Sequence, residues 1–531
     1  MNNGPELNII NVILGTTPLL VLLTSILVFR WSAPKSGAVS CLSVIVISGL
    51  FFGADTKILA ISSAKGLSLS IFVLSIIWTS VMLYNVIDSL GGIDVIGKTM
   101  TKLVADPLAQ ALVVGWAFSG VMQGIAGFGV PVAVVAPLMI FMGFLPARAA
   151  AIVLVGHAWA VTFGSLGSSY FMIQQQTGIP GEEIGPHMAA LFALPIIGTG
   201  FAVAHLQGGL ESIRRGIPII LSMGITMAIC LWITTLIGAP QIASIVAGLA
   251  GCTIGWIVAK TPLFPQKITK AKLTSNRIGA TKLNFHMAFM PYYLLLVFSV
   301  IVQIPVVKEF GNSLFWGLDY PATKTSLGHS VDEIQNYAKI TLMRHPAPLI
   351  LMSLIISYVI LSSRKLWQHK TAIKAASKTY NQCVSTSVGI ITMVMMALIM
   401  TDTGMTVLLA RTIATGTQET FPLISPYIGV LGTFMTGSNT NSNVMFGLLQ
   451  YETAQALGIT SITIASVQSI GGSLGSSIAP AKVLVGTAIV GISEKKTDKD
   501  LYGEVMKRTI PYCLILVLLV GIQAWIVINL F

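Results

Sequence analysis

A run of hydroxyl and carboxamide side chains interrupts an otherwise oily stretch of this chain, residues 433–449. The run reads Ser438-Asn439-Thr440-Asn441-Ser442-Asn443. Uncharged groups of this kind offer hydrogen-bond donors to a carboxylate or a hydroxyl, and they offer neutral oxygens to a hard cation. Such a run cannot face lipid. We therefore interpret it as part of a binding centre for a small anion. The alternative is a surface loop between two membrane spans, although the flanks lack the charge of such a loop.

Three other apolar stretches are also broken by glycine or small polar residues: 120–137, 157–171 and 469–491. A break in a membrane helix leaves backbone N–H groups bare at the start of the second half, which makes a small positive pole for an anion. Pro131 fits such a start, because proline is favoured in the first helical turn. The alternative is that the glycines only let neighbouring helices pack closely. The candidate substrate-binding residues in these breaks are Gln123, Gly124, Gly127, Gly129, Ser473, Ser476, Ser477 and Lys482.

Few groups in the apolar stretches can carry charge, and each has two interpretations. Lys482 can pair with a carboxylate as a point charge, or it can extend toward the membrane interface. His157 can carry a proton, or it can be a hydrogen-bonded structural residue. Asp402 can be a carboxylate at membrane depth, or it can cap the helix that begins near Met405. His157 and Asp402 are therefore the candidates for proton coupling.

The composition indicates which elements must position these groups. Of the 531 residues, 54% are hydrophobic and only 9% are charged, where a soluble domain carries about 25% charged residues. The mean hydropathy is +0.83. Several apolar runs have the roughly 20 residues that cross a bilayer, namely Ile9–Phe29, Leu67–Ile87, Ile217–Ile237, Ile242–Ala259 and Thr509–Leu530. We predict an all-α polytopic integral membrane protein with about 12–14 transmembrane helices, some of them discontinuous.

The breaks and the basic residues predict how the chain is organised. A first transmembrane half, 1–260, contains breaks near 120–131 and 157–171. A middle section, 261–345, comprises a basic cytoplasmic loop, one span and an external loop. A second transmembrane half, 346–531, contains breaks near 436–443 and 471–482. Paired breaks in corresponding halves are typical of an inverted repeat around a transporter site. Lys and Arg clusters near 214–215, 260–282, 364–378 and 495–508 place those loops in the cytoplasm and both termini outside.

Other classes of protein lack support in the sequence. The five cysteines are scattered, with no CxxC pair, and indicate neither a metal site nor a disulfide. The glycines of "GIAGFG" are not a nucleotide loop, because no Lys-Ser/Thr follows and no strand precedes them. HExxH is absent, and we find no pair of carboxylates spaced for acid–base catalysis, so we expect no enzyme, no metal and no cofactor. The net charge of +12 lies in short loops without interleaved aromatic residues, and this argues against nucleic acid as a partner.

At the four breaks the sequence resembles the L-lactate permease family. The resemblance runs from about Leu108 to the C-terminus, and the segments that carry it are "QGIAGFGVPVAV" (123–134), "VTFGSLG" (161–167), "TGSNTNSNVMFGLLQ" (436–450) and "GGSLGSSIAPAKVLVGTAIVG" (471–491). Family members are bacterial inner-membrane symporters of lactate and glycolate with protons. Three positions depart from the family pattern. Gln123 stands where an acidic residue is usual, Asn439 where aspartate is usual, and Ser476 where lysine is usual, although Lys482 follows six residues on.

The resemblance implies a multi-pass carrier in the bacterial cytoplasmic membrane. We expect a symporter of L-lactate or a related small 2-hydroxymonocarboxylate, with a proton as the coupling ion. Since the usual acidic positions are neutral here, the alternative is a Na⁺-coupled carrier or a facilitator for another small organic anion, such as glycolate or a sulfonated analogue. The expected partners are the monocarboxylate and the lipid bilayer.

Overall fold

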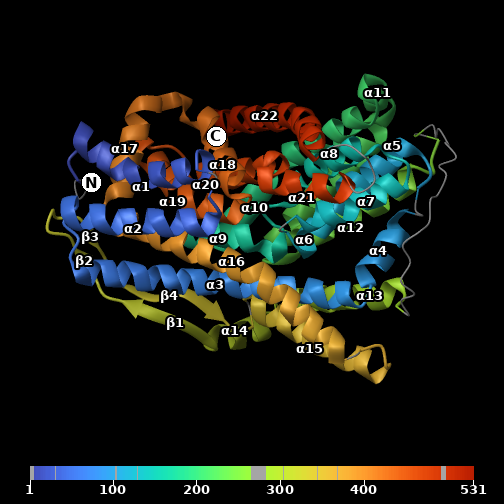
Figure 1. Cartoon of the computed structure of the whole chain (residues 1–531), viewed down its shortest axis with the longest axis horizontal. Coiled ribbons are helices and arrows are strands. Elements are labelled where there is room, and N and C mark those ends of the chain that lie inside the picture. Colours follow the sequence, from blue (N-terminus) through green and yellow to red (C-terminus); the bar gives the residue numbers. More distant parts are fainter. Residues whose placement is uncertain are drawn as a thin grey trace.

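The computed structural model describes residues 5–29, 31–101, 104–127, 129–262, 264, 283–302, 304–343, 345–367, 369–491 and 498–530. Most helices run side by side, close to the long axis of the molecule, and the strands gather at one edge (Figure 1). The predicted all-α membrane fold is confirmed. The basic stretches 265–282 and 492–497, on which part of the predicted orientation depends, lie outside the described residues. The inverted repeat and the division into halves stay predictions.

Ten helical stretches of the described residues are long and apolar enough to cross a membrane, or up to 11 if the bent pair α13–α14 forms one span. The long helices are α1 (Ile9–Leu27), α2 (Ala33–Phe51), α3 (Thr56–Ser89), α11 (Ala193–Leu236), α12 (Ala243–Val258), α13 (Phe285–Ile301), α15 (Pro346–Ser363), α16 (His369–Asp402) and α22 (Asp498–Leu530). This number is lower than the expected 12–14. One reason is that α11, with 44 residues, is longer than a single crossing and is bent.

The remaining helices are shorter, and several end at the predicted breaks. They are α4 (Gly92–Thr101), α5 (Pro107–Gln110), α6 (Ser119–Ile125), α7 (Val130–Phe141), α8 (Pro146–Gly156), α9 (Ser168–Thr177), α10 (Gly181–Leu191), α14 (Pro305–Ser313), α17 (Met405–Thr417), α18 (Phe421–Thr436), α19 (Asn439–Leu457), α20 (Ser461–Gly475) and α21 (Pro480–Gly491). A π-helical segment, η1 (Ala111–Phe118), joins α5 to α6. The helices α18–α21 are too short or too polar to count as spans, which also lowers the number.

The bend in α11 coincides with the predicted cytoplasmic turn before Ile217. Gly208 and Gly209 leave helical geometry there, and Gly209 has φ +67°. Just beyond the bend, the Arg215 guanidinium lies 2.7 Å from a carboxylate oxygen of Asp106. The same carboxylate accepts a hydrogen bond of 2.8 Å from the Leu108 amide and so caps α5. This ion pair ties the bend of α11 to the start of the helix that leads to the first break.

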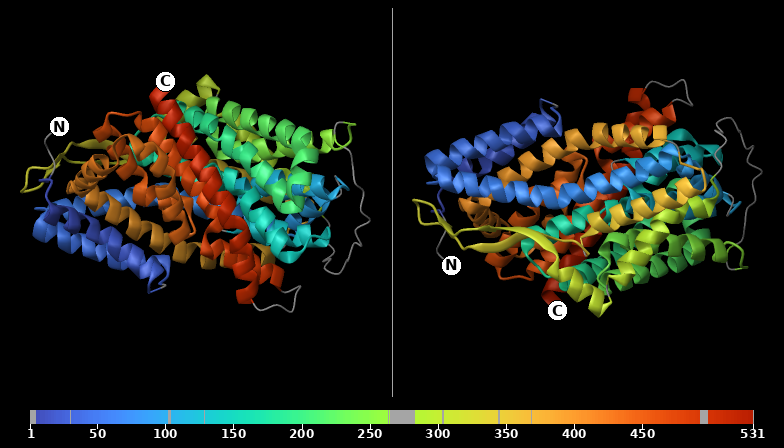
Figure 2. Two further views of the ribbon diagram at one scale, coloured as in Figure 1. Left: turned by 90° about the horizontal axis from the view of Figure 1, so that it is seen from above. Right: turned by 90° about the horizontal axis from the view of Figure 1, so that it is seen from below.

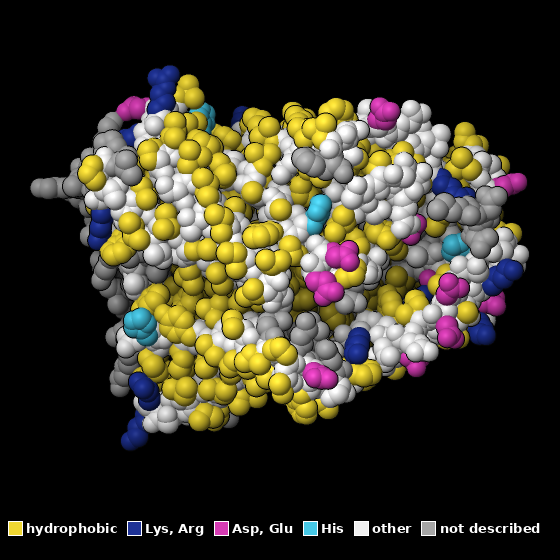
Figure 3. Space-filling view, turned by 180° about the vertical axis from the view of Figure 1, so that it is seen from behind, with side chains coloured by type: hydrophobic (Ala, Val, Ile, Leu, Met, Phe, Trp, Pro, Cys, Tyr) yellow, Lys and Arg dark blue, Asp and Glu magenta, His cyan; other side chains and the backbone are white. Residues whose placement is uncertain are grey.

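The short broken helices occupy the centre, and long helices surround them. Every residue in the most apolar windows of 107–125 and 146–177 is buried. By contrast, α1, α2, α15 and α22 expose large apolar side chains, including Ile10, Leu50, Val359 and Ile515. Hydrophobic side chains cover much of the face in Figure 3, and most Lys and Arg side chains lie toward its ends. This is the distribution that a lipid-facing surface requires.

Helices α3 and α16 are long and unbroken, and together they form a frame along one side of the centre. Helix α16 packs along α3 over much of its length, and both views in Figure 2 show the two helices side by side. At one end of this frame lie two small antiparallel sheets, within the section that was predicted to be external. Strand β1 (Phe315–Tyr320) pairs with β4 (Ile334–Thr341), and β2 (Thr323–Lys324) pairs with β3 (Ser330–Val331).

We predict that the close packing at Gly156, in the last turn of α8, tolerates no side chain. A Cβ at this position would lie 2.0 Å from the Gly115 carbonyl oxygen. Overpacking of this kind costs about 1–3 kcal/mol, so Gly156→Ala lowers the unfolding temperature of the detergent-solubilised protein. The matched control is Gly503→Ala in α22, where a Cβ meets nothing within 4 Å and alanine favours the helix. Equal unfolding temperatures for the two variants would contradict the packing argument.

Candidate functional site: a cavity lined by three helix breaks

A cavity of about 450 Å³ lies between the α3–α16 frame and the starts of three short helices. The frame contributes apolar and weakly polar side chains, among them Ile77, Val81, Tyr84, Gln382 and Thr386. The facing wall is formed by residues of three breaks, namely Ala126, Gly129, Val130, Thr436, Gly437, Ser438, Asn441, Ala481, Lys482 and Val485. Of the predicted site residues, this wall contains Gly129, Ser438, Asn441 and Lys482; the sequence analysis did not predict the frame on the other side.

The first break separates α6 from α7. After Ile125 the chain is extended at Ala126, and Gly129 has φ +84°, a conformation that strongly favours glycine. The Gly127 amide donates a hydrogen bond of 2.8 Å to Ser165 Oγ in the second break. Gly124 packs against α12 instead, since a Cβ there would lie 2.7 Å from Ile245 Cγ1. The close-packing interpretation thus holds for Gly124, whereas Gly129 lies at the cavity.

The second break, between α8 and α9, stores backbone strain. Ser165 and Leu166 have φ of +48° and +53°, and Gly167 follows with +83°. Left-handed geometry costs a residue with a side chain about 1–2 kcal/mol. The Ser165 hydroxyl occupies the position that satisfies the Gly127 amide, so this strain coincides with the contact between the first two breaks.

The polar run begins a buried helix, and the surface-loop alternative is wrong. Helix α18 ends at Thr436, and its C-cap residue Gly437 has φ +72°. Ser438 is the N-cap residue of α19, with its Oγ accepting from the Asn441 amide at 3.3 Å. The next five residues are at most 5% exposed. Only Ser438 and Asn441 of this run line the cavity. Thr440 instead contacts Ser169, with 2.9 Å between their hydroxyl oxygens.

The fourth break supplies the charge in the cavity wall. Helix α20 ends at Gly475, a 3₁₀ turn (Ser476–Ile478) follows, and α21 begins at Pro480. The Lys482 ammonium donates a hydrogen bond to Ser476 Oγ. Lys482 is 5% exposed, so it does not extend to the membrane interface. It is the one charged residue that lines the cavity, and no carboxylate of the described residues lies within ion-pair distance of it.

Hydrogen bonds join the second, third and fourth breaks behind the cavity wall. Ser473 Oγ donates to the Ala158 carbonyl at 2.6 Å and accepts from the Thr162 amide at 3.3 Å. The Asn439 carboxamide donates to Thr162 Oγ1 at 3.0 Å and to the Ser469 carbonyl at 3.1 Å. These contacts satisfy backbone groups that a broken helix would otherwise leave bare in an apolar medium.

Of the predicted residues, only Gly129, Ser438, Asn441 and Lys482 line the cavity. The others lie away from it, including Ser477, Gln123 and His157. Ser477 Oγ donates back to the Leu474 carbonyl at 2.7 Å. Gln123 is 2% exposed, and its Oε1 has no partner among the described residues. His157 is fully buried, and its Nδ1 lies 2.6 Å from the Val153 carbonyl oxygen. Because that carbonyl can only accept, Nδ1 carries the proton and Nε2, which has no described partner, is the free acceptor.

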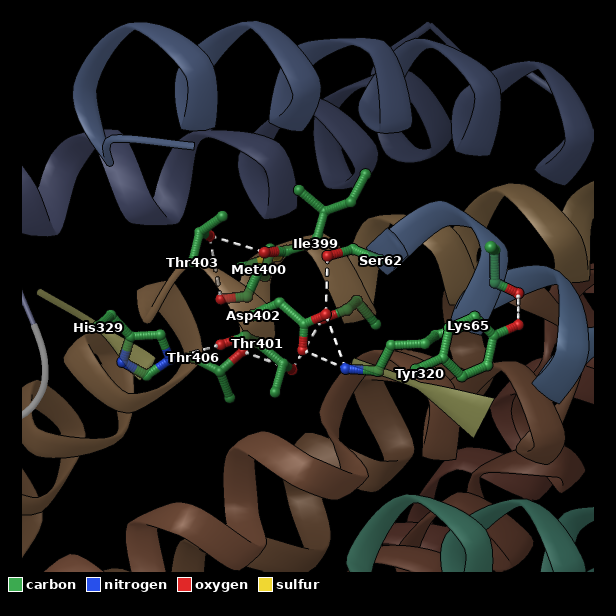
Figure 4. Close-up of polar contacts among 12 residues, drawn as sticks. Ser62, Lys65, Tyr320, His329, Ile399, Met400, Thr401, Asp402, Thr403 and Thr406 are labelled. Atoms are coloured by element: carbon green, nitrogen blue, oxygen red, sulfur yellow. Dashed lines mark hydrogen bonds and ion pairs between the residues drawn. The ribbon is translucent and has the colours of Figure 1, made fainter. Parts of the chain in front are cut away.

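Asp402 neither reaches the cavity nor caps α17, whose N-cap residue is Gly404. Its carboxylate lies between the long helices, where it accepts from the Lys65 ammonium at 2.8 and 2.9 Å and from Ser62 Oγ at 2.7 Å (Figure 4). Both side chains of the pair are at most 6% exposed. The pair stands roughly 20 Å along α16 from the cavity residue Gly389, at 1.5 Å per residue.

The strands cover this buried ion pair. Tyr320, at the end of β1, donates to the Ala64 carbonyl at 2.9 Å, and its hydroxyl lies 2.6 Å from Ser68 Oγ. His329 contacts the other long helix, α16, because its Nε2 lies 3.1 Å from the carbonyl oxygen of Thr401 in that helix. Figure 4 shows both contacts flanking the Lys65–Asp402 pair. The stranded section 315–341 therefore clamps α3 to α16 at the end remote from the cavity.

Sequence reasoning missed several residues of this arrangement. Thr162, Ser165 and Ser469 lie in the segments that were singled out, and their hydroxyls hold the breaks together. The sequence does contain a signal that would have identified Lys65, because a lysine in a long apolar helix needs a partner. Asp402 is the carboxylate that meets this need.

Four helix breaks, a buried cavity with one cation and an apolar outer surface define a class: a multi-pass α-helical transporter of the broken-helix type. Among the described residues, no group of three His, Cys, Asp or Glu side chains could hold a metal ion. The comparison with known proteins agrees with this class.

The sequence model of the L-lactate permease family matches residues 11–531, and the chain belongs to this family. It is 26% identical over 470 residues to the L-lactate permease of Escherichia coli (strain K12), covering 85% of this chain and 84% of that protein. It is 25% identical to the L-lactate permease of Bacillus subtilis (strain 168), covering 97% and 95%. It is also 25% identical to the glycolate permease GlcA of E. coli K12, covering 97% and 96%. The chain is thus a multi-pass permease of the cytoplasmic membrane.

We predict that Lys65 and Asp402 depend on each other for stability. Lys65→Met leaves a buried carboxylate without its partner, which costs about 3–5 kcal/mol, and sharply lowers the yield and unfolding temperature of the purified protein. The double variant Lys65→Met/Asp402→Asn removes both charges and recovers most of the loss. A double variant no more stable than Lys65→Met alone would show that the pair is not the cause.

Proposed function

We propose that this permease is a secondary active transporter, a symporter of L-lactate or a related small 2-hydroxymonocarboxylate. The observation that carries the proposal is Lys482, a lone buried cation in the wall of a cavity between broken helices. A monocarboxylate is the anion that a single ammonium group neutralises. The names of the relatives, L-lactate permease and glycolate permease, support the same substrate class.

The cavity offers complementary groups to each part of such a substrate. The Lys482 ammonium pairs with the carboxylate, and the N-terminus of α19 at Ser438 adds a favourable dipole of about 0.3–1 kcal/mol. The Asn441 carboxamide, also in the wall, can bond the 2-hydroxyl group. Val81 and Val485 provide apolar contact for the remaining carbon. This division of polar and apolar contacts is typical of small-ligand sites.

The position of Lys482 accounts for one departure from the family pattern. The resemblance implies a lysine where this chain has Ser476. Here Lys482, from the next helix, brings its ammonium to the Ser476 hydroxyl. A positive charge is therefore present beside position 476, but Lys482 carries it and not the residue at position 476.

The coupling ion has two candidates. The resemblance implies a proton, for which His157 is the proposed carrier, and one proton with one anion makes transport electroneutral. Na⁺ is the second candidate, because Asn439 and Thr433 each have a buried side-chain oxygen without a partner among the described residues. Proteoliposomes that take up labelled lactate under an imposed pH gradient or an imposed Na⁺ gradient distinguish the two. If uptake follows neither gradient but the protein exchanges lactate in counterflow, the protein is a facilitator and not a symporter. The absence of any lactate uptake would refute the proposal.

We predict that Lys482→Met weakens lactate binding about 10- to 100-fold, because a hydrogen bond to a charged group contributes about 1.5–3 kcal/mol. Lys482→Arg retains the charge and keeps part of the affinity. The matched control is Lys57→Met, which removes an exposed lysine at the start of α3 and leaves binding unchanged. Wild-type lactate affinity in a well-folded Lys482→Met protein would exclude the residue from the site.

A further inference from the structure

The carboxamide of Asn439 has a fixed orientation. Its Nδ2 donates to the Ser469 carbonyl at 3.1 Å, and that backbone oxygen can only accept. Exchanging the nitrogen and oxygen of this side chain would place two acceptors against each other, so the assignment is determined by its partner. The Asn439 Oδ1 atom must therefore point away from Ser469, on the opposite side of the amide.

On that side the oxygen meets no donor. Asn439 Oδ1 and Thr433 Oγ1 are both buried and have no hydrogen-bond partner among the described residues. They face the same small region beside Gly472. The point where a Cβ on Gly472 would lie is 2.0 Å from Asn439 Oδ1 and 3.0 Å from Thr433 Oγ1. Unpaired buried acceptors are costly, so two of them converging on one bare glycine indicate a missing positive partner.

The backbone around these oxygens is also electronegative. Thr433 lies in the last turn of α18, which ends at Thr436, and the last carbonyls of a helix carry partial negative charge. The first residue of α19 is Asn439. The start of α19 thus faces the cavity at Ser438, while Thr433, in the last turn of α18, has its Oγ1 near Gly472. In broken-helix transporters, half-helix C-termini and unwound carbonyls hold cations.

We propose that Asn439 Oδ1 and Thr433 Oγ1, together with the C-terminal end of α18, bind Na⁺. The set consists of neutral oxygens, which suit a hard monovalent cation, whereas Ca²⁺ and Mg²⁺ sites use carboxylates and none is present here. Neither side chain titrates, so the site cannot carry a proton. The inference rests on the proposed function, because it names Na⁺ as the coupling ion of that carrier in place of the proton that the resemblance implies.

Lys482 explains why the anion and the cation would bind together. Both ligands share the break that Gly437 and Ser438 form, and Lys482 is the charged residue of the adjoining cavity. Without substrate its ammonium disfavours a second cation nearby, and a bound carboxylate neutralises it. By thermodynamic reciprocity Na⁺ must then tighten lactate binding by the same factor.

The test uses the purified full-length protein. Lactate affinity and unfolding temperature are measured in NaCl and in choline chloride at equal ionic strength and pH, with KCl as a third condition. We expect Na⁺ to raise the unfolding temperature and to tighten lactate binding at least tenfold relative to choline. Equal affinity and equal unfolding temperature in Na⁺ and choline would overturn the site. An effect of K⁺ as large as that of Na⁺ would also overturn the assignment.

Single-residue variants test whether Thr433 is part of the Na⁺ site. Thr433→Val removes one oxygen at nearly constant volume and abolishes the Na⁺ dependence, while Thr433→Ser retains it. The matched control is Thr453→Val in α19, a buried threonine whose hydroxyl bonds the Leu449 carbonyl at 2.7 Å, and this variant keeps the full Na⁺ response. Persistence of the response in Thr433→Val overturns the site. If Thr433→Val fails to fold, Thr433→Ala, which removes the same hydroxyl and introduces no new contact, takes its place.

Failure of the proposed function gives a different pattern. A Na⁺-dependent unfolding temperature that is lost in Thr433→Val, without lactate binding in any salt, supports the ion site and refutes the lactate carrier. Lactate binding that is equal in all three salts supports the carrier and refutes the ion site.

Discussion

The structure depends on one constraint: a backbone N–H or C=O group in hydrocarbon needs a partner, and a broken helix has several without one. In this protein the breaks satisfy one another. The Gly127 amide of the first break bonds Ser165 of the second, and the Thr162 amide of the second bonds Ser473 of the fourth. The breaks therefore have to meet in the interior. Because the hydroxyls that satisfy the backbone lie behind the wall, the helix starts themselves are left facing the cavity.

This constraint also explains what the sequence could and could not predict. Glycine, proline and clustered small polar residues in apolar runs have few stable environments in a membrane, so the four breaks and the all-α fold were readable. The run at 438–443 was recognisable as buried because its flanks carry no charge. Pairings between distant segments were not readable. Nothing local to Asp402 indicates that Lys65 and Ser62 are its partners, and Asp402 was instead considered as a proton-coupling carboxylate or as a helix cap. Likewise, no spacing rule predicts that Lys482 reaches back to Ser476.

The three departures from the family pattern change the electrostatics of the centre more than its architecture. Asn439 occupies a position that the resemblance assigns to aspartate, and its carboxamide nitrogen now makes two hydrogen bonds that hold the second, third and fourth breaks together. A carboxylate could not donate them. The exchange of a charged acid for an amide therefore stiffens the meeting point of the breaks and leaves one neutral oxygen toward Gly472. The positive charge of the site is kept by Lys482, so the net effect is a centre with a cation and no fixed anion.

A carrier must also expose its site to one side of the membrane at a time, and the two walls of the cavity differ in a way that suits this. One wall consists of short helices cross-linked to each other by hydrogen bonds, which favour movement of these helices together. The other wall is the pair of long helices α3 and α16, locked together at their far end by the buried Lys65–Asp402 pair and by Tyr320 and His329 of the stranded section. Between these two bodies, α3 and α16 present both apolar side chains, such as Ile77 and Val81, and polar ones, such as Gln382 and Thr386, to the cavity. The apolar contacts are non-directional, so they resist sliding less than hydrogen bonds do. Relative motion of the two bodies would thus open or close the cavity without breaking the polar contacts that define the site.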